Sequence, residues 1–202
     1  MVFCPIYASE HHETTEVVNL PVDAETGILS FMSLGFPHDS FDDLIAANSD
    51  YQKTFKYSEL TGSAAKGLAI VTCMDSRINP LSVVGMRSGD AKILRNAGAR
   101  VTEDVLRTLV LATYLLNVDR ILVMPHTDCR MAQGEESAIH KLIDEQYGVN
   151  TSSLEFRTTT DQIGALASDV NRVRSYPLLR KGVVVAGAIY DVKTGSLTPY
   201  DA

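Results

Sequence analysis

From about residue 68 onward, short apolar runs alternate with segments in which apolar residues recur at helical spacing. Runs rich in β-branched residues predict buried strands over residues 68–73, 91–94, 120–125 and 182–190. Strands that alternate with helices predict an α/β fold, with a mostly parallel central sheet flanked by helices on both faces.

The helices between these strands are predicted from start signals and periodicity. Pro80 suits the first position of a short helix that runs to about residue 86, and Thr102 suits the N-cap of a longer, apolar helix. Further helices are predicted over residues 134–147 and 160–175. The Lys-Thr-Gly-Ser stretch at 193–196 predicts a hairpin turn into a short edge strand.

The first part of the chain shows no regular period. We interpret residues 1–37 as an N-terminal arm and residues 38–202 as a single α/β domain. A helix is expected to begin near Ser40, because Ser40 and Asp43 resemble a capping box.

Composition and charge limit the classes of function. The 202 residues are 45% hydrophobic and 21% charged, which is ordinary for a soluble globular protein. The net charge of −7 disfavours a nucleic-acid partner. No apolar run reaches the roughly 18 residues needed to cross a bilayer, and the acidic N-terminal stretch lacks the cations of a secretory or mitochondrial signal. We therefore expect a cytoplasmic protein without a nucleic-acid or membrane partner.

The cysteine count points away from disulfides. Three cysteines make an odd number, which does not suit a disulfide framework. We interpret Cys4, in the predicted arm, as a free thiol.

Metal-binding residue types follow two of the predicted strands. Cys73 ends the first strand and is followed by Asp75 and Arg77, whereas His126 and Cys129 follow the third. Ligands gather at the carboxyl ends of strands in open α/β sheets, where neighbouring strands lie about 5 Å apart. Two thiolates, an imidazole and a carboxylate are the residue types that hold Zn²⁺. Because Arg77 competes with a metal for Asp75, the pattern favours an enzyme over a structural zinc site.

A purely structural interpretation makes the cysteines small buried hydrophobes and His126 a core histidine. That interpretation leaves Asp75 and Arg77 unexplained, since alternation at the strand end would point both the same way as Cys73.

These residues lie in segments that resemble a known family. Cys73-Met-Asp-Ser-Arg77, Arg95-Asn-Ala-Gly98 and His126-Thr-Asp-Cys129 are similar to the signature segments of the β-class carbonic anhydrases, in particular its small actinobacterial-type members. The resemblance covers residues 65–132 and extends to the strand at 182–190. It implies the α/β fold of that family and a zinc lyase, a carbonate dehydratase, that hydrates CO2 reversibly to bicarbonate and a proton.

The resemblance also implies roles for individual residues. Zinc would be bound by Cys73, His126 and Cys129, with an open position for water. Asp75 and Arg77 would form the catalytic pair, in which Arg77 holds Asp75 off the metal; when that pair breaks, Asp75 becomes the fourth ligand and closes the site. N-terminal helices of the family wrap a partner subunit, which implies a homodimer or a dimer-based tetramer.

The second signature segment, Arg95 to Gly98, is expected to be structural. Arg95 and Asn96 would brace the turn, and Gly98 would permit a positive φ or a close backbone approach.

One position departs from the family pattern. Arg130 stands where the family usually has Gly, and it can narrow the pocket, attract bicarbonate, pair with Asp128 or Glu135, or point outward. Two alternative functions stay open: a carbonyl sulfide or carbon disulfide hydrolase on the same zinc ligands, and a non-catalytic, zinc-stabilised interaction protein with the acidic arm as its binding element.

Overall fold

The computed structural model describes residues 36–201, so Cys4 and nearly all of the predicted arm lie outside the described residues. The chain divides into two compact units, the first ending at Phe55 and the second beginning at Lys56. Each unit is described by itself, and a single domain over residues 38–202 stays a prediction.

The first unit contributes helix α1 (His38–Thr54). This helix was expected to begin near Ser40, but it begins two residues earlier with Pro37 at the N-cap and no side-chain cap. The predicted capping box is therefore wrong, because Ser40 already lies within the first turn. The apolar side chains of Phe41, Leu44 and Ile45 are exposed.

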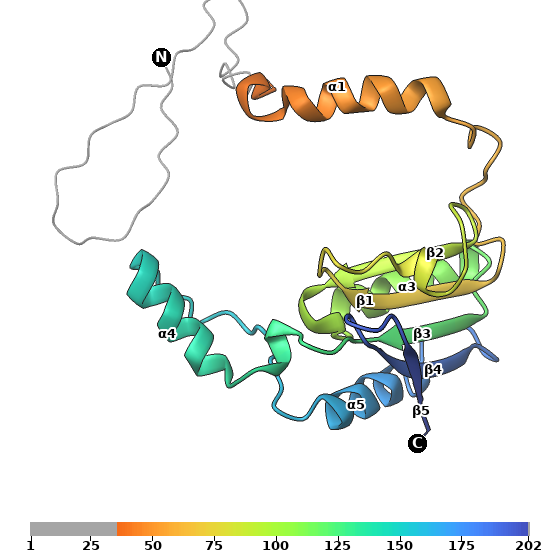
Figure 1. The fold of residues 1–202 in the computed structure, drawn as a ribbon. Helices are drawn as coiled ribbons and strands as arrows, with labels where there is room; N and C mark the ends of the chain where they lie inside the picture. Colours follow the sequence, from red (N-terminus) through yellow and green to blue (C-terminus); the bar gives the residue numbers. More distant parts are fainter. Residues whose placement is uncertain (1–35, 202) are drawn as a thin grey trace, which may run out of the picture. The chain divides into compact units, whose positions relative to one another are not determined.

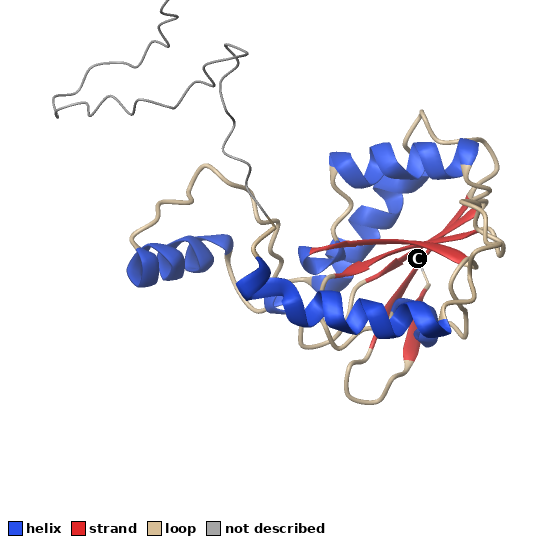
Figure 2. Ribbon diagram, turned by 90° about the horizontal axis from the view of Figure 1, so that it is seen from above, coloured by secondary structure: helices blue, strands red, loops and turns tan. Residues whose placement is uncertain are grey.

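The second unit is built on a five-stranded sheet with the order β2-β1-β3-β4-β5 (Figure 1). The strands are β1 (Leu68–Cys73), β2 (Ala91–Asn96), β3 (Arg120–Met124), β4 (Val184–Tyr190) and β5 (Leu197–Tyr200). β1 to β4 pair in parallel, and β5 runs antiparallel to β4. The strands fan out in Figure 2, as expected for a twisted sheet. The predicted fold class and edge strand are confirmed.

The helices begin close to where the sequence places them. They are α2 (Pro80–Val83), α3 (Glu103–Leu115), α4 (Glu136–Tyr147) and α5 (Gln162–Arg174), with short 3-10 turns η1 (Ala97–Ala99) and η2 (Arg130–Ala132). Pro80 opens α2, and the Thr102 side chain accepts a hydrogen bond from the backbone N–H of Val105 at the start of α3. α2 ends before residue 86, because Gly85 takes a positive φ of 66° just after it. None of the described helices is long and apolar enough to cross a membrane.

The two faces of the sheet are covered unequally. α3 and α5 pack on the same face, where they form a continuous core with β1, β3 and β4. Its members include Val71, Leu106, Leu109, Val123, Leu166 and Val170. The opposite face is covered by α2 and the segment after β4, around Ile70, Ile78 and Met124. α4 buries no residue and lies away from the sheet in both views (Figures 1 and 2).

Strand order determines where a site can form. β1 lies between β2 and β3, so the chain passes from β1 to β2 on one side and later forms β3 on the other side of β1. Open α/β sheets bind ligands at the carboxyl ends of the strands beside such a switch point. Cys73 is the last residue of β1, and His126 follows shortly after β3.

Candidate metal centre

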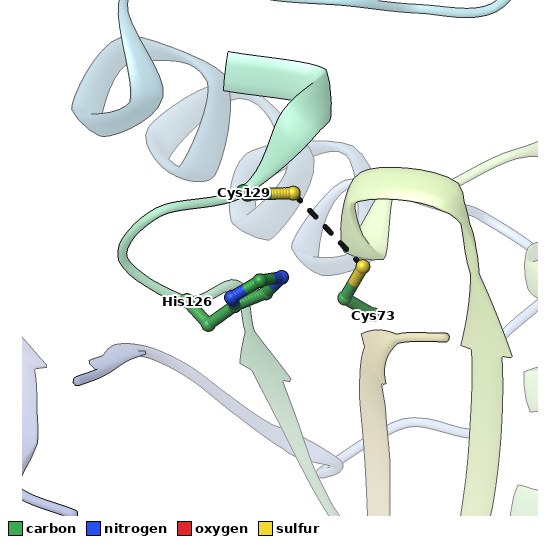
Figure 3. A group of neighbouring side chains, drawn as sticks. All are labelled: Cys73, His126 and Cys129. Atoms are coloured by element: carbon green, nitrogen blue, oxygen red, sulfur yellow. Dashed lines mark hydrogen bonds between the residues drawn. The ribbon is translucent and has the colours of Figure 1, made fainter. Parts of the chain in front are cut away.

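Three predicted ligands converge at the carboxyl ends of β1 and β3. Cys73, His126 and Cys129 each offer one ligand atom, and these atoms all lie within 4.8 Å of one another (Figure 3). The two Sγ atoms are 3.9 Å apart. In a tetrahedral zinc site with Zn–S bonds of about 2.3 Å, two sulfurs lie about 3.8 Å apart. All three residues are buried, so the centre is shielded from bulk water.

His126 presents a nitrogen that lacks a partner. Its Nδ1 lies 2.8 Å from the Thr127 carbonyl oxygen, so Nδ1 carries the proton and donates to that oxygen. Its Nε2 is buried and has no hydrogen-bond partner among the described residues. A buried polar atom without a partner is costly, and a metal ion would satisfy it. The donor set and its spacing therefore fit zinc.

A hydrogen bond joins the Sγ atoms of Cys73 and Cys129. Their mutual hydrogen bond lowers the pKa of Cys73 far below its usual range, and the same bond, with burial, raises the pKa of Cys129. The backbone N–H groups of Gly98 and Asp75 lower the pKa of Cys73 further. Zinc needs both sulfurs as thiolates, so metal binding would release the Cys129 proton.

Gly98 allows the two ligand loops to meet. It has a φ of 77°, and a Cβ at this position would lie 3.0 Å from Cβ of Met131, two residues after Cys129. Of the two predicted reasons for Gly98, the positive φ is confirmed, and the close contact is with the Met131 side chain. On the other side of the centre, the Gln162 amide donates a hydrogen bond of 2.8 Å to the His126 carbonyl oxygen.

Asp75 and Arg77 form a bidentate pair beside the ligands. Arg77 Nε lies 3.0 Å from Asp75 Oδ1, and Nη2 lies 2.7 Å from Oδ2. These hydrogen bonds lower the pKa of Asp75, which keeps the carboxylate ionised. Asp75 Oδ2 also lies 3.8 Å from Nε2 of His126. The carboxylate therefore reaches the ligand cluster while Arg77 holds it.

A turn, rather than strand alternation, brings this pair together. β1 ends at Cys73, and the N–H of Ile78 donates to the Asp75 carbonyl oxygen at 3.1 Å. The expectation that alternation orients Asp75 and Arg77 is wrong, because the extended backbone stops before them.

Arg95 and Asn96 have different roles. Asn96 braces the turn as predicted, since its side chain donates to the Arg100 carbonyl oxygen and accepts from the Arg100 N–H at 2.7 and 2.9 Å. Arg95 instead donates to the carbonyl oxygens of Cys73 and Asp75 at 2.9 and 2.6 Å. It thereby fixes the backbone that carries both the ligand and the carboxylate.

Asp128 is a site residue that the sequence reasoning missed. Its Oδ2 accepts a hydrogen bond of 2.8 Å from Arg77 Nη1, and its Oδ1 accepts one of 3.1 Å from the Gln133 amide. From the sequence, Asp128 is expected only as a possible partner for Arg130. A signal was present in the sequence. Asp128 is an acidic residue between the predicted ligands His126 and Cys129, and Arg77 follows the neighbouring strand.

Arg130, the departure from the family pattern, points outward. It is exposed, and its guanidinium makes no hydrogen bond or ion pair with the described residues. Pairing with Asp128 does not form, because Asp128 is bound to Arg77 and Gln133.

Comparison with known proteins identifies clear relatives. The carbonic anhydrase family profile matches residues 68–197. β-carbonic anhydrase 1 of Mycobacterium tuberculosis is 34% identical over 157 residues, which cover 77% of this chain and 94% of the relative. The carbon disulfide hydrolase of Saccharolobus solfataricus is 32% identical over 154 residues, or 64% of this chain and 75% of the relative. The crystal structure of a carbonic anhydrase from Streptococcus mutans superposes with a TM-score of 0.75 and 33% identity, covering 83% of this chain and all of that one.

Proposed function

Because the chain belongs to the β-carbonic anhydrase family, we propose that it is a zinc lyase that hydrates CO2 reversibly to bicarbonate and a proton. The convergence of Cys73, His126 and Cys129, with a buried His126 Nε2 that has no partner within residues 36–201, is the observation that carries this proposal. These three side chains would hold the zinc.

The residues around the centre have distinct tasks in the proposed reaction. When bound, Zn²⁺ lowers the pKa of a coordinated water to about 7 and so supplies a nucleophile at neutral pH. Asp75 would accept a hydrogen bond from the attacking oxygen and so orient it toward CO2. Arg77 binds both carboxylate oxygens of Asp75, which keeps Asp75 ionised and away from the metal position.

Carbon disulfide or carbonyl sulfide hydrolysis is the second candidate. A relative that carries the name carbon disulfide hydrolase has an identity similar to that of the carbonic anhydrases. In both reactions a nucleophile attacks the central carbon of a linear, triatomic molecule, so the same metal ligands can serve either reaction. A non-catalytic role is disfavoured, because it gives no use for Asp75 and Arg77 beside the ligand cluster.

Stopped-flow measurement of proton release from CO2 hydration, beside assays for sulfide release from carbonyl sulfide and carbon disulfide, tests the proposal. We expect CO2 hydration by the zinc-loaded protein and its loss in Cys73→Ser and His126→Ala, which also lose the metal. Cys4→Ser is the matched control and should keep both. Sulfide release without CO2 hydration would establish the second candidate. The absence of both activities would overturn both candidates.

We further propose a homodimer or a dimer-based tetramer. α1 buries none of its residues and carries exposed Phe41, Leu44 and Ile45 along one side, which suits contact with a second copy. Sedimentation should show a shift to monomer in Leu44→Asp with Ile45→Asp. Ala46→Asp places one such charge on the other side of α1 and should leave the assembly intact.

We also propose a cytoplasmic location. Cys73 and Cys129 must stay reduced to bind zinc, and a reducing compartment provides that. Fractionation of cells that produce the protein tests the location, and recovery outside the cytoplasmic fraction would contradict it.

A further inference from the structure

Arg77 is shared between two carboxylates that come from different strand ends. Asp75 takes the Nε and Nη2 edge of the guanidinium, whereas the Asp128 carboxylate takes Nη1. Nη2 also donates to the Asp128 carbonyl oxygen at 3.2 Å. Because the two carboxylates use different N–H groups, they do not compete, and together they fix the plane of the guanidinium.

Asp128 is itself held in place by two features. Its backbone has a positive φ of 55°, a conformation that Asp tolerates better than most residues. Its second carboxylate oxygen accepts the hydrogen bond from the Gln133 amide, five residues further along the same loop. The loop thus presents Asp128 outward to Arg77 while the next residue, Cys129, points into the metal centre.

Arg77 needs such an anchor. Its side chain is 45% exposed, and an exposed ion pair with Asp75 alone would hold a long, flexible side chain weakly. Asp75 Oδ2 lies only 3.8 Å from His126 Nε2, so a small displacement of the guanidinium frees this carboxylate beside the ligand cluster.

We propose that Asp128, held by Gln133, is a positioning residue that fixes Arg77 so that Arg77 keeps Asp75 away from the metal. This inference rests on the proposed function for its effect on catalysis. It assigns no contact with substrate to Asp128 or Gln133, which act through Arg77.

The rate of zinc release separates this role from a merely structural one. In Asp128→Asn the backbone conformation is still tolerated, but the charge that anchors Arg77 is lost. We expect slower transfer of zinc to a chromogenic chelator, because the released Asp75 adds a carboxylate to the ligand set. The kcat for CO2 hydration should fall about three- to fivefold with KM little changed. If Asp128 only stabilised the loop, zinc would be released faster, and that result would overturn the proposal.

Further variants complete the test. Gln133→Ala should also slow zinc release and lower kcat, each by a smaller factor than Asp128→Asn does. In an Arg77→Ala background, Asp128→Asn should have no additional effect, since both act on Asp75 through one side chain. Glu135→Gln removes the same charge from the same loop and should match the wild type. Zinc release is measured without substrate, so it still tests the inference if the protein proves inactive on CO2; unchanged or faster release in Asp128→Asn contradicts the inference alone.

Discussion

At the scale of single residues, the candidate site depends on competition for one carboxylate. Asp75 lies between the Arg77 guanidinium, at 2.7 Å, and the imidazole of His126, at 3.8 Å. The charge-assisted, bidentate bond to Arg77 is the stronger of these contacts in the described structure. With the same three buried residues, Asp75 can either stay bound to Arg77 or join the cluster as a fourth metal ligand. Arg77, which is not itself a ligand, selects between these two states.

Arg77→Ala should retain zinc and lose at least about tenfold in kcat, since Asp75 is no longer held in a productive orientation. Metal analysis and stopped-flow CO2 hydration on one preparation measure both effects. Arg107→Ala removes another exposed arginine, paired with Asp104, and should change neither. Unchanged turnover in Arg77→Ala would remove Arg77 from the mechanism.

At the scale of elements, the contact between α5 and β4 leaves little free space. A Cβ built on Gly187 of β4 would lie 3.0 Å from side-chain atoms of both Leu166 and Val170 of α5. These two residues belong to the core that α5 shares with the sheet. The small residue therefore allows helix and strand to pack closely.

Gly187→Val should destabilise the protein by about 1–3 kcal/mol, because the added methyl groups overpack this contact. The change is measured as a lower midpoint of urea unfolding. Gly134→Val serves as the control, because open space surrounds a Cβ at that position. Equal effects of the two substitutions would contradict the packing argument.

One carboxylate helps to attach α4 to the loop that follows it. Glu136 accepts hydrogen bonds from the backbone N–H groups of Phe156 and Arg157 at 2.9 and 2.8 Å. These bonds, first that from Phe156, lower the pKa of Glu136. A carboxyl group with a depressed folded-state pKa stabilises the protein above its unfolded value of about 4.3, and this contribution disappears as the pH falls through the folded-state pKa.

Glu136→Gln should therefore be less stable than the wild type at pH 7, and the difference should narrow as the pH falls below about 4. Urea unfolding of both proteins across this range measures it, and the comparison cancels the pH dependence of every other group. Glu145→Gln, on the exposed surface of the same helix, should show a much smaller difference. A difference that stays constant with pH would show that the ionised carboxylate is not responsible.

At the scale of the whole molecule, the metal would link distant parts of the chain. Cys73 and Cys129 are separated by 56 positions and follow different strands, yet their sulfurs are 3.9 Å apart. Ligands gathered in this way bind metal tightly only in the folded state, so the free energy of metal binding adds to the stability of the fold.

Removing zinc with a chelator should lower the thermal midpoint, and returning zinc should restore it. Zinc at a thousand times its dissociation constant would contribute about 4 kcal/mol. Calorimetry of the loaded, stripped and reloaded protein measures the shift, with magnesium in place of zinc as the control. Identical midpoints for the loaded and stripped forms would contradict the assignment of the centre.

The sequence alone determined those features that depend on local pattern. β1 is found as predicted because a short β-branched run favours one buried strand, and Thr102 begins α3 because its hydroxyl satisfies a free N–H there. The convergence of Cys73, His126 and Cys129 was also predictable, since the carboxyl ends of neighbouring parallel strands lie at one edge of a sheet.

Only the tertiary structure decided which distant residues meet. Arg77 and Asp128 lie 51 positions apart, and their pairing depends on strand register and on the left-handed backbone at Asp128. α3 and α5 share one face of the sheet because of the strand order and the path of the connections. The apolar periodicity of each helix does not specify which face of the sheet it covers. Local pattern thus specifies what each segment forms, whereas the contacts that join Asp75, Arg77 and Asp128 depend on where separate segments are placed in space.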